Sequence, residues 1–180
     1  MPNSIRENNN DVRAFVATHP EIKIVLDVGP GEGTYHWLIQ DLIDAMDGVE
    51  IWEKNVEDFS LRNRYRSIIV NDIRETIDAI HLYDYDMIIF GDVLEHLPLV
   101  DAIDVFHKAL KLAPWVLVSV PMQHFEQGAI DGNEHEHHEI EDPQIDLIPK
   151  LPVPRYWWTY RVTGTFIYQG TMAVEAAEAA

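Results

Sequence analysis

Three glycines at alternate positions follow a short apolar run near the start of the sequence. The run Ile24-Val-Leu-Asp-Val-Gly-Pro-Gly-Glu-Gly33 places Gly29, Gly31 and Gly33 directly after it. Glycine adopts positive φ readily and lets a ligand approach the backbone amides closely. A dinucleotide site needs Gly or Ala three positions after the second glycine, where this sequence has Thr34, and no Lys-Ser or Lys-Thr of a P-loop follows. The spacing therefore predicts a ligand-binding turn that serves neither a dinucleotide nor a P-loop nucleotide.

Acidic residues stand beside this turn and at the ends of the next two apolar runs. Asp27 precedes the glycines, Glu50 lies in the second run, and Asp72 follows the third. Because a carboxylate offers two acceptor oxygens, Glu50 at a strand tip can accept hydrogen bonds from both hydroxyls of a ribose. Trp52, just beyond, offers a flat ring for a nucleobase. The alternative interpretation is that Glu50 and Glu53 are solvated charges.

A fourth apolar run ends in Gly91-Asp-Val-Leu-Glu-His96. Together with the glycine turn and the acids, this order of motifs resembles the class I S-adenosylmethionine-dependent methyltransferases. The Val-Leu-Glu-His segment resembles their ubiquinone-biosynthesis-like branch, and the likeness covers residues 22–121. It implies a single-domain α/β, Rossmann-like fold whose mostly parallel seven-stranded sheet ends in an antiparallel C-terminal hairpin. It also implies S-adenosylmethionine as the cofactor.

The resemblance assigns cofactor binding to the loops that follow the first four strands. An acid at Asp72 would accept a hydrogen bond from the adenine amino group, while the backbone amide of Ile73 meets a ring nitrogen. No metal ligand is expected. The predicted cofactor-binding residues are Asp27, Gly29, Pro30, Gly31, Gly33, Glu50, Ile51, Trp52, Asp72, Ile73 and Asp92.

Three histidines are the candidate catalytic residues, and a general base is needed only if the methyl acceptor must lose a proton. His96 follows the fourth strand, although packing near the methionine end of the cofactor is its alternative role. His124 begins the segment 122–154, where an acceptor would bind. His137 lies in the polar run 132–139, which is interpreted as a solvated loop, an acceptor lid or a metal site.

The elements that must position these residues follow from hydrophobic periodicity. Strands alternating with helices favour a parallel sheet with both faces covered. The predicted strands are residues 22–28, 49–52, 67–70, 86–90 and 115–120, and the predicted helices are residues 11–19, 35–46 and 99–112.

The remainder of the chain departs from this alternation. Residues 122–154 are polar and proline-rich and predict an inserted lid with a helical turn. Strands over 156–162 and 165–168 would flank a turn at Thr163–Gly164. We therefore predict one domain, residues 1–180, with a cofactor-binding core (10–121), a lid and acceptor loop (122–154), a hairpin (155–170) and a tail (171–180). Residues 175–180 of the tail are expected to fray.

The amino-acid composition limits the kinds of molecule that this protein is expected to bind. The 180 residues include 31 acidic and 13 basic side chains, for a net charge of −18, which disfavours nucleic acid unless Arg62, Arg64 and Arg66 form a local patch. The absence of cysteine excludes disulfides, thiolate zinc sites and cysteine nucleophiles. Without a signal-like or membrane-length apolar run, we expect a cytoplasmic protein that does not bind membranes.

Motifs that are absent from the sequence exclude two subclasses of methyltransferase. The run Asp92-Val-Leu-Glu lacks the Pro-Pro-aromatic motif of nucleobase amino-methyltransferases, and Pro121-Met-Gln-His124 lacks the Asp-Asn pair of catechol-type enzymes. We therefore expect methyl transfer to an oxygen or nitrogen of an unidentified small molecule. The alternatives are a catalytically degenerate cofactor-binding scaffold and a metal-binding module built on residues 132–139. Because residues 122–154 make a small lid, a homodimer or a partner protein is expected to complete it.

Overall fold

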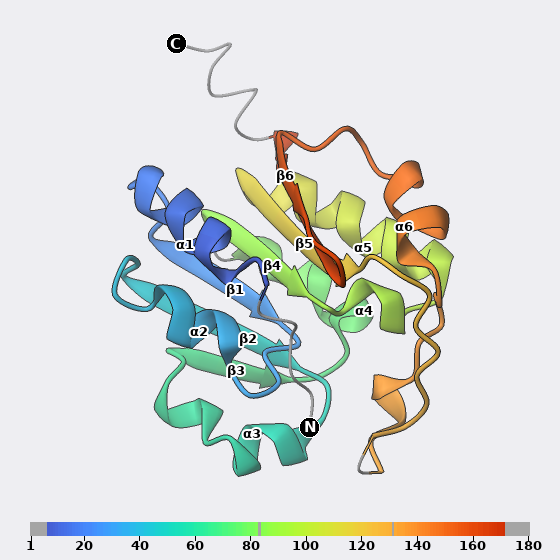
Figure 1. The fold of residues 1–180 in the computed structure, drawn as a ribbon. Helices are drawn as coiled ribbons and strands as arrows, with labels where there is room; N and C mark the ends of the chain where they lie inside the picture. The colour runs from blue at the N-terminus through green and yellow to red at the C-terminus, as the bar shows by residue number, and fades with distance from the viewer. Residues whose placement is uncertain (1–6, 83, 131, 172–180) are drawn as a thin grey trace.

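A computed structural model describes residues 7–82, 84–130 and 132–171, and in this part of the chain seven strands form one sheet (Figure 1). The order is β3-β2-β1-β4-β5-β7-β6. The first five strands pair in parallel, whereas β7 runs antiparallel to both β5 and β6. This confirms the predicted fold class. The strands are β1 (Ile24–Val28), β2 (Ala45–Glu50), β3 (Ser67–Val70), β4 (Met87–Gly91), β5 (Trp115–Pro121), β6 (Tyr156–Thr159) and β7 (Thr163–Gln169).

Helices cover both faces of the sheet, with α1 and α2 on one face and α4 and α5 on the other (Figure 1). The α-helices are α1 (Asn9–Thr18), α2 (Thr34–Ile39), α3 (Glu53–Asp58), α4 (Ile73–Thr76), α5 (Leu99–Leu112) and α6 (Pro143–Asp146). Short 3₁₀ turns occupy Leu61–Asn63, Ile77–Leu82, Leu94–His96, Glu134–Glu136 and Ile148–Lys150.

The central strands are apolar on both faces, so the sheet separates two cores. In β4, Ile88 and Phe90 belong to the core beneath α5, whereas Met87 and Ile89 belong to the core beneath α1 and α2. Successive side chains of a strand point to opposite faces, and a strand covered on both sides reads as a continuous apolar run. The ring of Phe106 on α5 meets Tyr168 of β7 edge to face at 4.7 Å, which packs the helix against the C-terminal strand.

The second strand begins earlier than predicted, and the helix before it is shorter. Helix α2 ends at Ile39, and residue 46, assigned to that helix by its spacing, lies in β2. A charged residue and a glycine inside the strand obscure its pattern. Asp47 is buried but accepts hydrogen bonds from Arg66 Nε (3.0 Å) and the Tyr85 hydroxyl (2.9 Å). A Cβ on Gly48 would lie 2.5 Å from Ile68, so a side chain does not fit there.

The turn of the C-terminal hairpin was also placed wrongly, because Thr163 and Gly164 lie within β7. The turn comprises residues 160–162, and the Tyr160 amide donates to the Thr163 carbonyl at 2.9 Å. Gly164 pairs with Val120 on one side and Thr159 on the other. A Cβ there would lie 2.5 Å from Met122 Sδ. Glycine in a strand often marks such a close approach rather than a turn.

Residues 122–154 form the predicted insert, which passes from β5 along one side of the molecule to α6 and back toward β6 (Figure 1). In its described residues, 122–130 and 132–154, the helical segments are two 3₁₀ turns and the single turn of α6. The predicted fraying of residues 175–180 lies outside the described residues. In the part of the chain that the structure describes, no helix is long and apolar enough to cross a bilayer.

Candidate functional site

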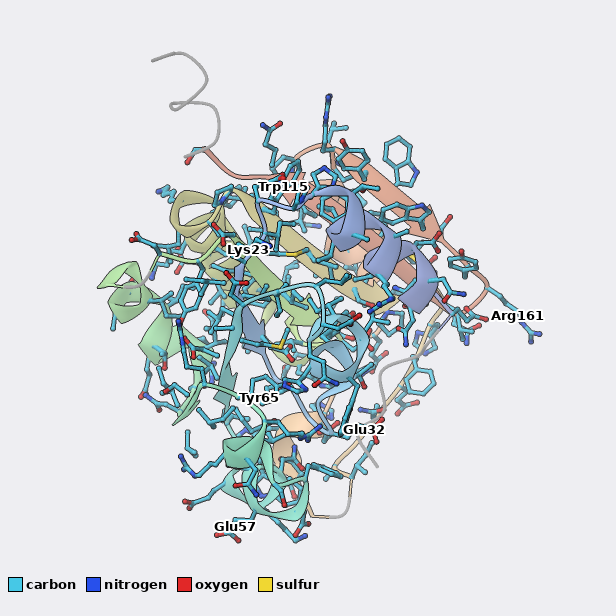
Figure 2. All side chains as sticks on the ribbon, turned by 90° about the vertical axis from the view of Figure 1, so that its left-hand side faces the viewer. Lys23, Glu32, Glu57, Tyr65, Trp115 and Arg161 are labelled. Atoms are coloured by element: carbon cyan, nitrogen blue, oxygen red, sulfur yellow. The ribbon has the colours of Figure 1, made fainter. Side chains whose placement is uncertain are left out.

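A cavity of about 390 Å³ lies at the carboxyl ends of the parallel strands. The loops after β1, β2, β3 and β4 line it together with part of the insert, namely Gln123, Phe125, Gln127, Ile130 and residues 133–139. Figure 2 shows Lys23 and Trp115, at the amino ends of β1 and β5, far from Glu32, which follows the carboxyl end of β1. The sheet order reverses between β1 and β4, and open α/β sheets bind ligands at such a reversal.

The glycine turn adopts left-handed backbone conformations at all three glycines. The φ angles of Gly29, Gly31 and Gly33 are +63°, +52° and +83°. The amide of Gly29 donates to the Val49 carbonyl at 2.8 Å, which ties the turn to β2. Gly29, Pro30 and Gly31 line the cavity. These conformations explain why the sequence carries glycines there.

Gly33 lies outside the cavity lining and packs against Arg64 instead. A Cβ at Gly33 would lie 2.6 Å from Arg64 Nη1. The Nη2 of this arginine donates to the carbonyls of Glu32 (2.9 Å) and Phe59 (2.8 Å). The guanidinium therefore joins the glycine turn to the chain after α3. The absence of a side chain at Gly33 gives it the room to do so.

Glu50 is the best-defined polar group of the cavity. Its side chain is 3% exposed, and it accepts hydrogen bonds from the amides of Gly31 (3.2 Å) and Trp52 (3.0 Å) and from Asn55 Nδ2 (3.4 Å). Burial raises the pKa of Glu50, and the hydrogen bonds from Trp52, Gly31 and Asn55 oppose that shift. The carboxylate thus faces the cavity from a fixed position beside the glycine turn.

Asp27 supports the glycine turn from below rather than lining the cavity. It is 1% exposed, and its Oδ2 accepts a hydrogen bond of 2.7 Å from the Tyr65 hydroxyl. Burial raises the pKa of Asp27 to about 7, while the Tyr65 hydrogen bond opposes this shift and nearby Glu50 adds to it. The predicted cofactor residue is therefore a buried acid one layer beneath the cavity surface.

Asp72 caps α4 and lines the cavity with Ile73. Its Oδ1 accepts from the Arg74 amide at 2.8 Å, and Arg74 Nη2 lies 2.6 Å from Oδ2. Partial burial raises the pKa of Asp72, but the hydrogen bonds from Arg74 outweigh it and lower the pKa overall. Arg74 also pairs with Asp101 at 3.1 Å, so the acid is held ionised within an ion-pair network.

Asp92 occupies a strained position at the end of β4. Its φ of +56° is uncommon for a residue with a side chain. The hydroxyl of Ser119 donates to Asp92 Oδ1 at 3.1 Å, and Asp92 lines the cavity. Gly91 before it packs on Tyr35, whose ring would lie 2.1 Å from a Cβ at Gly91. Together these contacts fix Asp92 at the end of β4, where it lines the cavity.

The two residues after Glu50 are placed differently from each other. Ile51 lines the cavity, as predicted for a cofactor contact. The Trp52 ring lies outside the lining, with Lys54 Nζ 5.6 Å from its centroid. Trp52 therefore contributes its backbone amide to Glu50, and the aliphatic side chain of Ile51 forms this part of the cavity wall.

Two of the three candidate catalytic histidines line the cavity, and the third does not. His96 lines the cavity, its Nδ1 lies 3.1 Å from the His137 carbonyl, and burial lowers its pKa to about 4. His137 is exposed and lines the cavity as well. His124 is exposed outside the lining, and its hydrogen bond with Asp142 (3.0 Å) raises its pKa. The structure therefore brings His96 and His137 together and leaves His124 outside.

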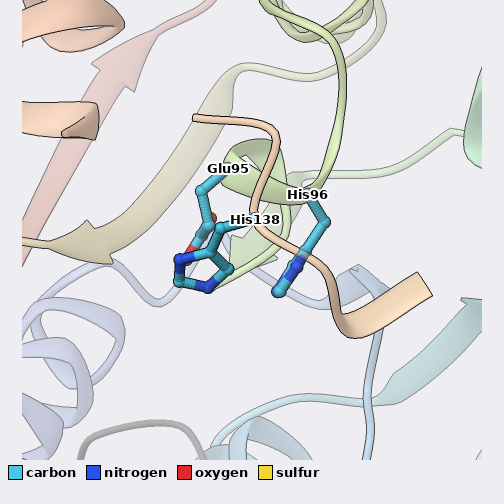
Figure 3. Close-up of side chains that lie close together, drawn as sticks. All are labelled: Glu95, His96 and His138. Carbon is cyan, nitrogen blue, oxygen red and sulfur yellow. The ribbon is translucent and has the colours of Figure 1, made fainter. Parts of the chain in front are cut away.

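Two buried titratable residues of the cavity wall were not among the predicted site residues. Glu95 is 0% exposed, and neither of its carboxyl oxygens has a hydrogen-bond partner among the described residues. Burial raises the pKa of Glu95 well above its usual range. His138 is 5% exposed, and burial lowers its pKa. Figure 3 shows both beside His96. The sequence signal existed, since Glu95 lies in the Val-Leu-Glu-His motif and His138 in the histidine-rich run.

No protein-family model and no curated protein matches the sequence. Solved structures do match. The N-terminal domain of EvdMO1 with SAH bound is 14% identical, with a TM-score of 0.64 over 93% of this chain and 82% of that domain. Magnesium protoporphyrin IX methyltransferase (ChlM) from Synechocystis PCC 6803 with bound SAM is 19% identical, with a TM-score of 0.57 over 90% and 77%. The methyltransferase domain of bacterial CtHen1-CN is 17% identical, with a TM-score of 0.62 over 91% and 98%.

The chain has the class I methyltransferase fold. At these identities the likeness concerns the fold, and the described chain spans most of each matched structure. Within this methyltransferase fold, the cavity lies at the strand-order reversal where the predicted cofactor loops meet.

Proposed function

We propose that this chain binds S-adenosylmethionine in the cavity and transfers its methyl group to an oxygen or nitrogen of a small molecule. The observation that carries the proposal is the position of Glu50. Its nearly buried carboxylate is fixed by the amide of Gly31 at the edge of a turn whose glycines all have positive φ. The structures of EvdMO1 with SAH and ChlM with SAM, which share the fold, support the choice of cofactor.

The residues present fit a nucleoside at this edge of the cavity. Glu50 is engaged by protein donors, yet two carboxylate oxygens offer about four acceptor sites, which leaves capacity for ribose hydroxyls. Ile51 and Ile73 would contact the adenine ring. Asp72 would accept from its amino group in place of one of the hydrogen bonds that Arg74 donates to both of its carboxyl oxygens. The Trp52 ring is not required for this arrangement.

The other end of the cavity suits the methionine part of the cofactor. Gly29 and Gly31 let the backbone approach the ligand, and Asp92 offers a carboxylate for an ammonium group. Asp27 and Gly33 would act indirectly by holding the glycine turn against Tyr65 and Arg64. S-adenosylmethionine would supply an electrophilic methyl group on a sulfonium, and the protein's main task would be to position the acceptor.

Residues of the insert are proposed to bind that acceptor. His137 and Gln127 line the cavity from the insert, and His96 lines it from the turn after β4. His96 is a candidate for contacting the acceptor from the core side of the cavity, whereas His124 lies outside the lining. The net charge of −18 favours a small-molecule acceptor over nucleic acid. A second copy of the chain or a partner protein would complete the lid.

Calorimetric titration with S-adenosylhomocysteine tests this function. Wild-type protein should bind it at micromolar strength, and NADH and ATP should not bind. Glu50→Ala should weaken binding by about 1–3 kcal/mol, the scale for losing hydrogen bonds to a charged acceptor. Glu53→Ala, an exposed neighbour at the start of α3, is the matched control and should bind normally. Absence of binding to the wild-type protein would refute the proposal.

A further inference from the structure

Three potential ligand side chains converge in the wall of the cavity beneath the insert. Glu95 and His96 come from the 3₁₀ turn after β4, and His138 comes from the insert (Figure 3). One donor atom of each lies within 4.8 Å of the others. The amides of Glu139 and Ile140 both donate to the Glu95 carbonyl at 3.0 Å, so this part of the insert is fixed against the turn. These backbone hydrogen bonds therefore hold the insert, which carries His138, against the turn that carries Glu95 and His96.

The hydrogen bonds of the two imidazoles determine which nitrogen is available. Nδ1 of His96 lies 3.1 Å from the His137 carbonyl, and Nδ1 of His138 lies 2.7 Å from the Phe125 carbonyl. A carbonyl oxygen only accepts, so Nδ1 must carry the proton in both rings. In the neutral imidazole Nε2 then keeps its lone pair. Histidines that bind metal ions are commonly oriented in this way, by donation from the other nitrogen to a backbone carbonyl or carboxylate.

Glu95 gives an independent reason to expect a cation. The side chain is fully buried, and among the described residues neither oxygen has a hydrogen-bond partner. Buried polar groups in native proteins are nearly always satisfied, and those that are not often mark an ion or a functional role. Asp92 adds further negative charge next to Glu95. A bound cation would satisfy the carboxylate and compensate this charge.

We propose that Glu95, His96 and His138 bind a divalent transition-metal ion. Two imidazole nitrogens and one carboxylate oxygen form the donor set of many catalytic zinc and iron sites, which keep further positions for a ligand. Soft thiolate ligands are absent from the sequence, and an all-oxygen set of the magnesium or calcium type is not formed by these three side chains. Zinc, with cobalt as its spectroscopic substitute, is the ion to which we assign the site.

The ion would face the same cavity as Glu50 and Gly31. A remaining coordination position would accept an oxygen of the ligand, which assigns the acceptor to compounds that carry a hydroxyl, phenolic or carboxylate oxygen. This assignment of the acceptor rests on the proposed function, whereas the metal site itself does not. The ion would also fix the insert over the cavity, because His138 belongs to the insert and the other two ligands belong to the core.

Metal binding to the protein without nucleoside tests the site. Wild-type protein is freed of metal with EDTA, exchanged into chelator-free buffer and titrated with Zn²⁺ by calorimetry. It should bind one ion per chain, and Co²⁺ should give the visible absorption of a site with few ligands. Glu95→Gln keeps the shape of the side chain but loses its charge, and His138→Ala removes a nitrogen ligand. Each variant should weaken Zn²⁺ binding by about 100-fold or more, since loss of a supporting residue alone costs about 10–100-fold.

His107→Ala is the matched control, because His107 is exposed on α5 and outside the cavity lining. Its Zn²⁺ affinity should equal that of the wild type. The melting temperature in EDTA verifies that each variant is folded, and added Zn²⁺ should raise it only in the wild type and the control. Equal binding by wild type and Glu95→Gln, or no stoichiometric binding at all, would overturn the proposal.

A separate titration keeps this inference apart from the proposed function. S-adenosylhomocysteine is added to the metal-free wild-type protein. Nucleoside binding without Zn²⁺ binding would refute the metal site alone. Conversely, Zn²⁺ binding that depends on Glu95 and His138, in a protein that does not bind the nucleoside, would refute the proposed function and uphold the metal site.

Discussion

The amide of Gly31 donates a hydrogen bond of 3.2 Å to Oε2 of Glu50, which joins the glycine turn after β1 to the end of β2. Both residues line the cavity, and Gly31 has a φ of +52°. The bond forms only if the turn keeps its left-handed conformation. The position of the carboxylate and the backbone geometry of the turn are therefore coupled.

Replacing Gly31 should show this coupling. Gly31→Val should abolish binding of S-adenosylhomocysteine, because a β-branched residue resists positive φ and would place its side chain in the cavity. Gly128→Val is the control, since a Cβ at Gly128 meets nothing within 4 Å. Calorimetry measures the affinity, and circular dichroism checks the fold. Normal binding by Gly31→Val would show that the ligand does not lie against this turn.

Gly33 should affect stability through Arg64 rather than through the ligand. Gly33→Ala combines positive φ with a Cβ 2.6 Å from Arg64 Nη1, so we expect a loss of about 1–3 kcal/mol in the free energy of unfolding. Urea unfolding measures it. In an Arg64→Ala background the same substitution should cost less, because the close contact is gone and the backbone strain remains. Equal costs in both backgrounds would mean that the contact carries no energy.

Asp27 should make stability depend on pH. Its pKa in the folded protein is raised to about 7, so the folded state binds more protons than the unfolded state between about pH 4 and pH 7. The contribution of Asp27 to stability therefore falls as pH rises through this window. Asp27→Asn can still accept the Tyr65 hydrogen bond. It should match the wild type near pH 4 and exceed it by a few kcal/mol at pH 8.

Urea unfolding at several pH values measures this difference. The comparison of the two proteins isolates Asp27 from the other charged neighbours of the site, Glu50 and Arg64, which both proteins keep. A constant difference from pH 4 to pH 8 would show that the Asp27 carboxyl ionises normally in the folded protein.

The three clustered arginines should not bind nucleic acid. Arg64 donates to the Glu32 and Phe59 carbonyls, and Arg66 pairs with the buried Asp47. Arg62 Nη1 donates to the Ile68 carbonyl at 3.5 Å, so all three guanidinium groups are engaged within the protein. With a net charge of −18, we expect no shift of duplex DNA or generic RNA in a gel at physiological salt. Tight binding that weakens steeply with salt would show that these groups are available after all.

Helices and strands were predicted accurately from the sequence where the hydrophobic periodicity was clear. Residues 67–70 and 99–112 have the bounds of β3 and α5, and the glycine turn lies at the cavity as expected. Strand β2 was misplaced because Asp47 and Gly48 are acceptable inside it only through tertiary contacts with Arg66, Tyr85 and Ile68. A local pattern contains no information on those contacts.

The candidate site shows the same limit. Glu50 and Asp72 were predicted as site residues because each lies in or just after a short apolar run, and in the structure they lie at the end of β2 and after β3. The sequence does not distinguish His138 from the adjacent His137, because the backbone conformation decides which of the two side chains points into the protein. In the structure His138 is buried against Phe125 and His137 is exposed. Spacing along the insert does not reveal which of the two meets Glu95.

The antiparallel strand β7 lies between β5 and β6, although it is the last strand in the sequence that the structure describes. During synthesis on a ribosome, β5 would therefore wait with an unpaired apolar edge until residues 163–169 have emerged. In the described sheet β6 pairs with β7 and does not cover that edge of β5. Exposed strand edges promote association between chains. A nascent chain stalled with residue 163 still inside the ribosome should consequently recruit chaperones or aggregate, whereas one in which residues 163–169 have emerged should close its sheet.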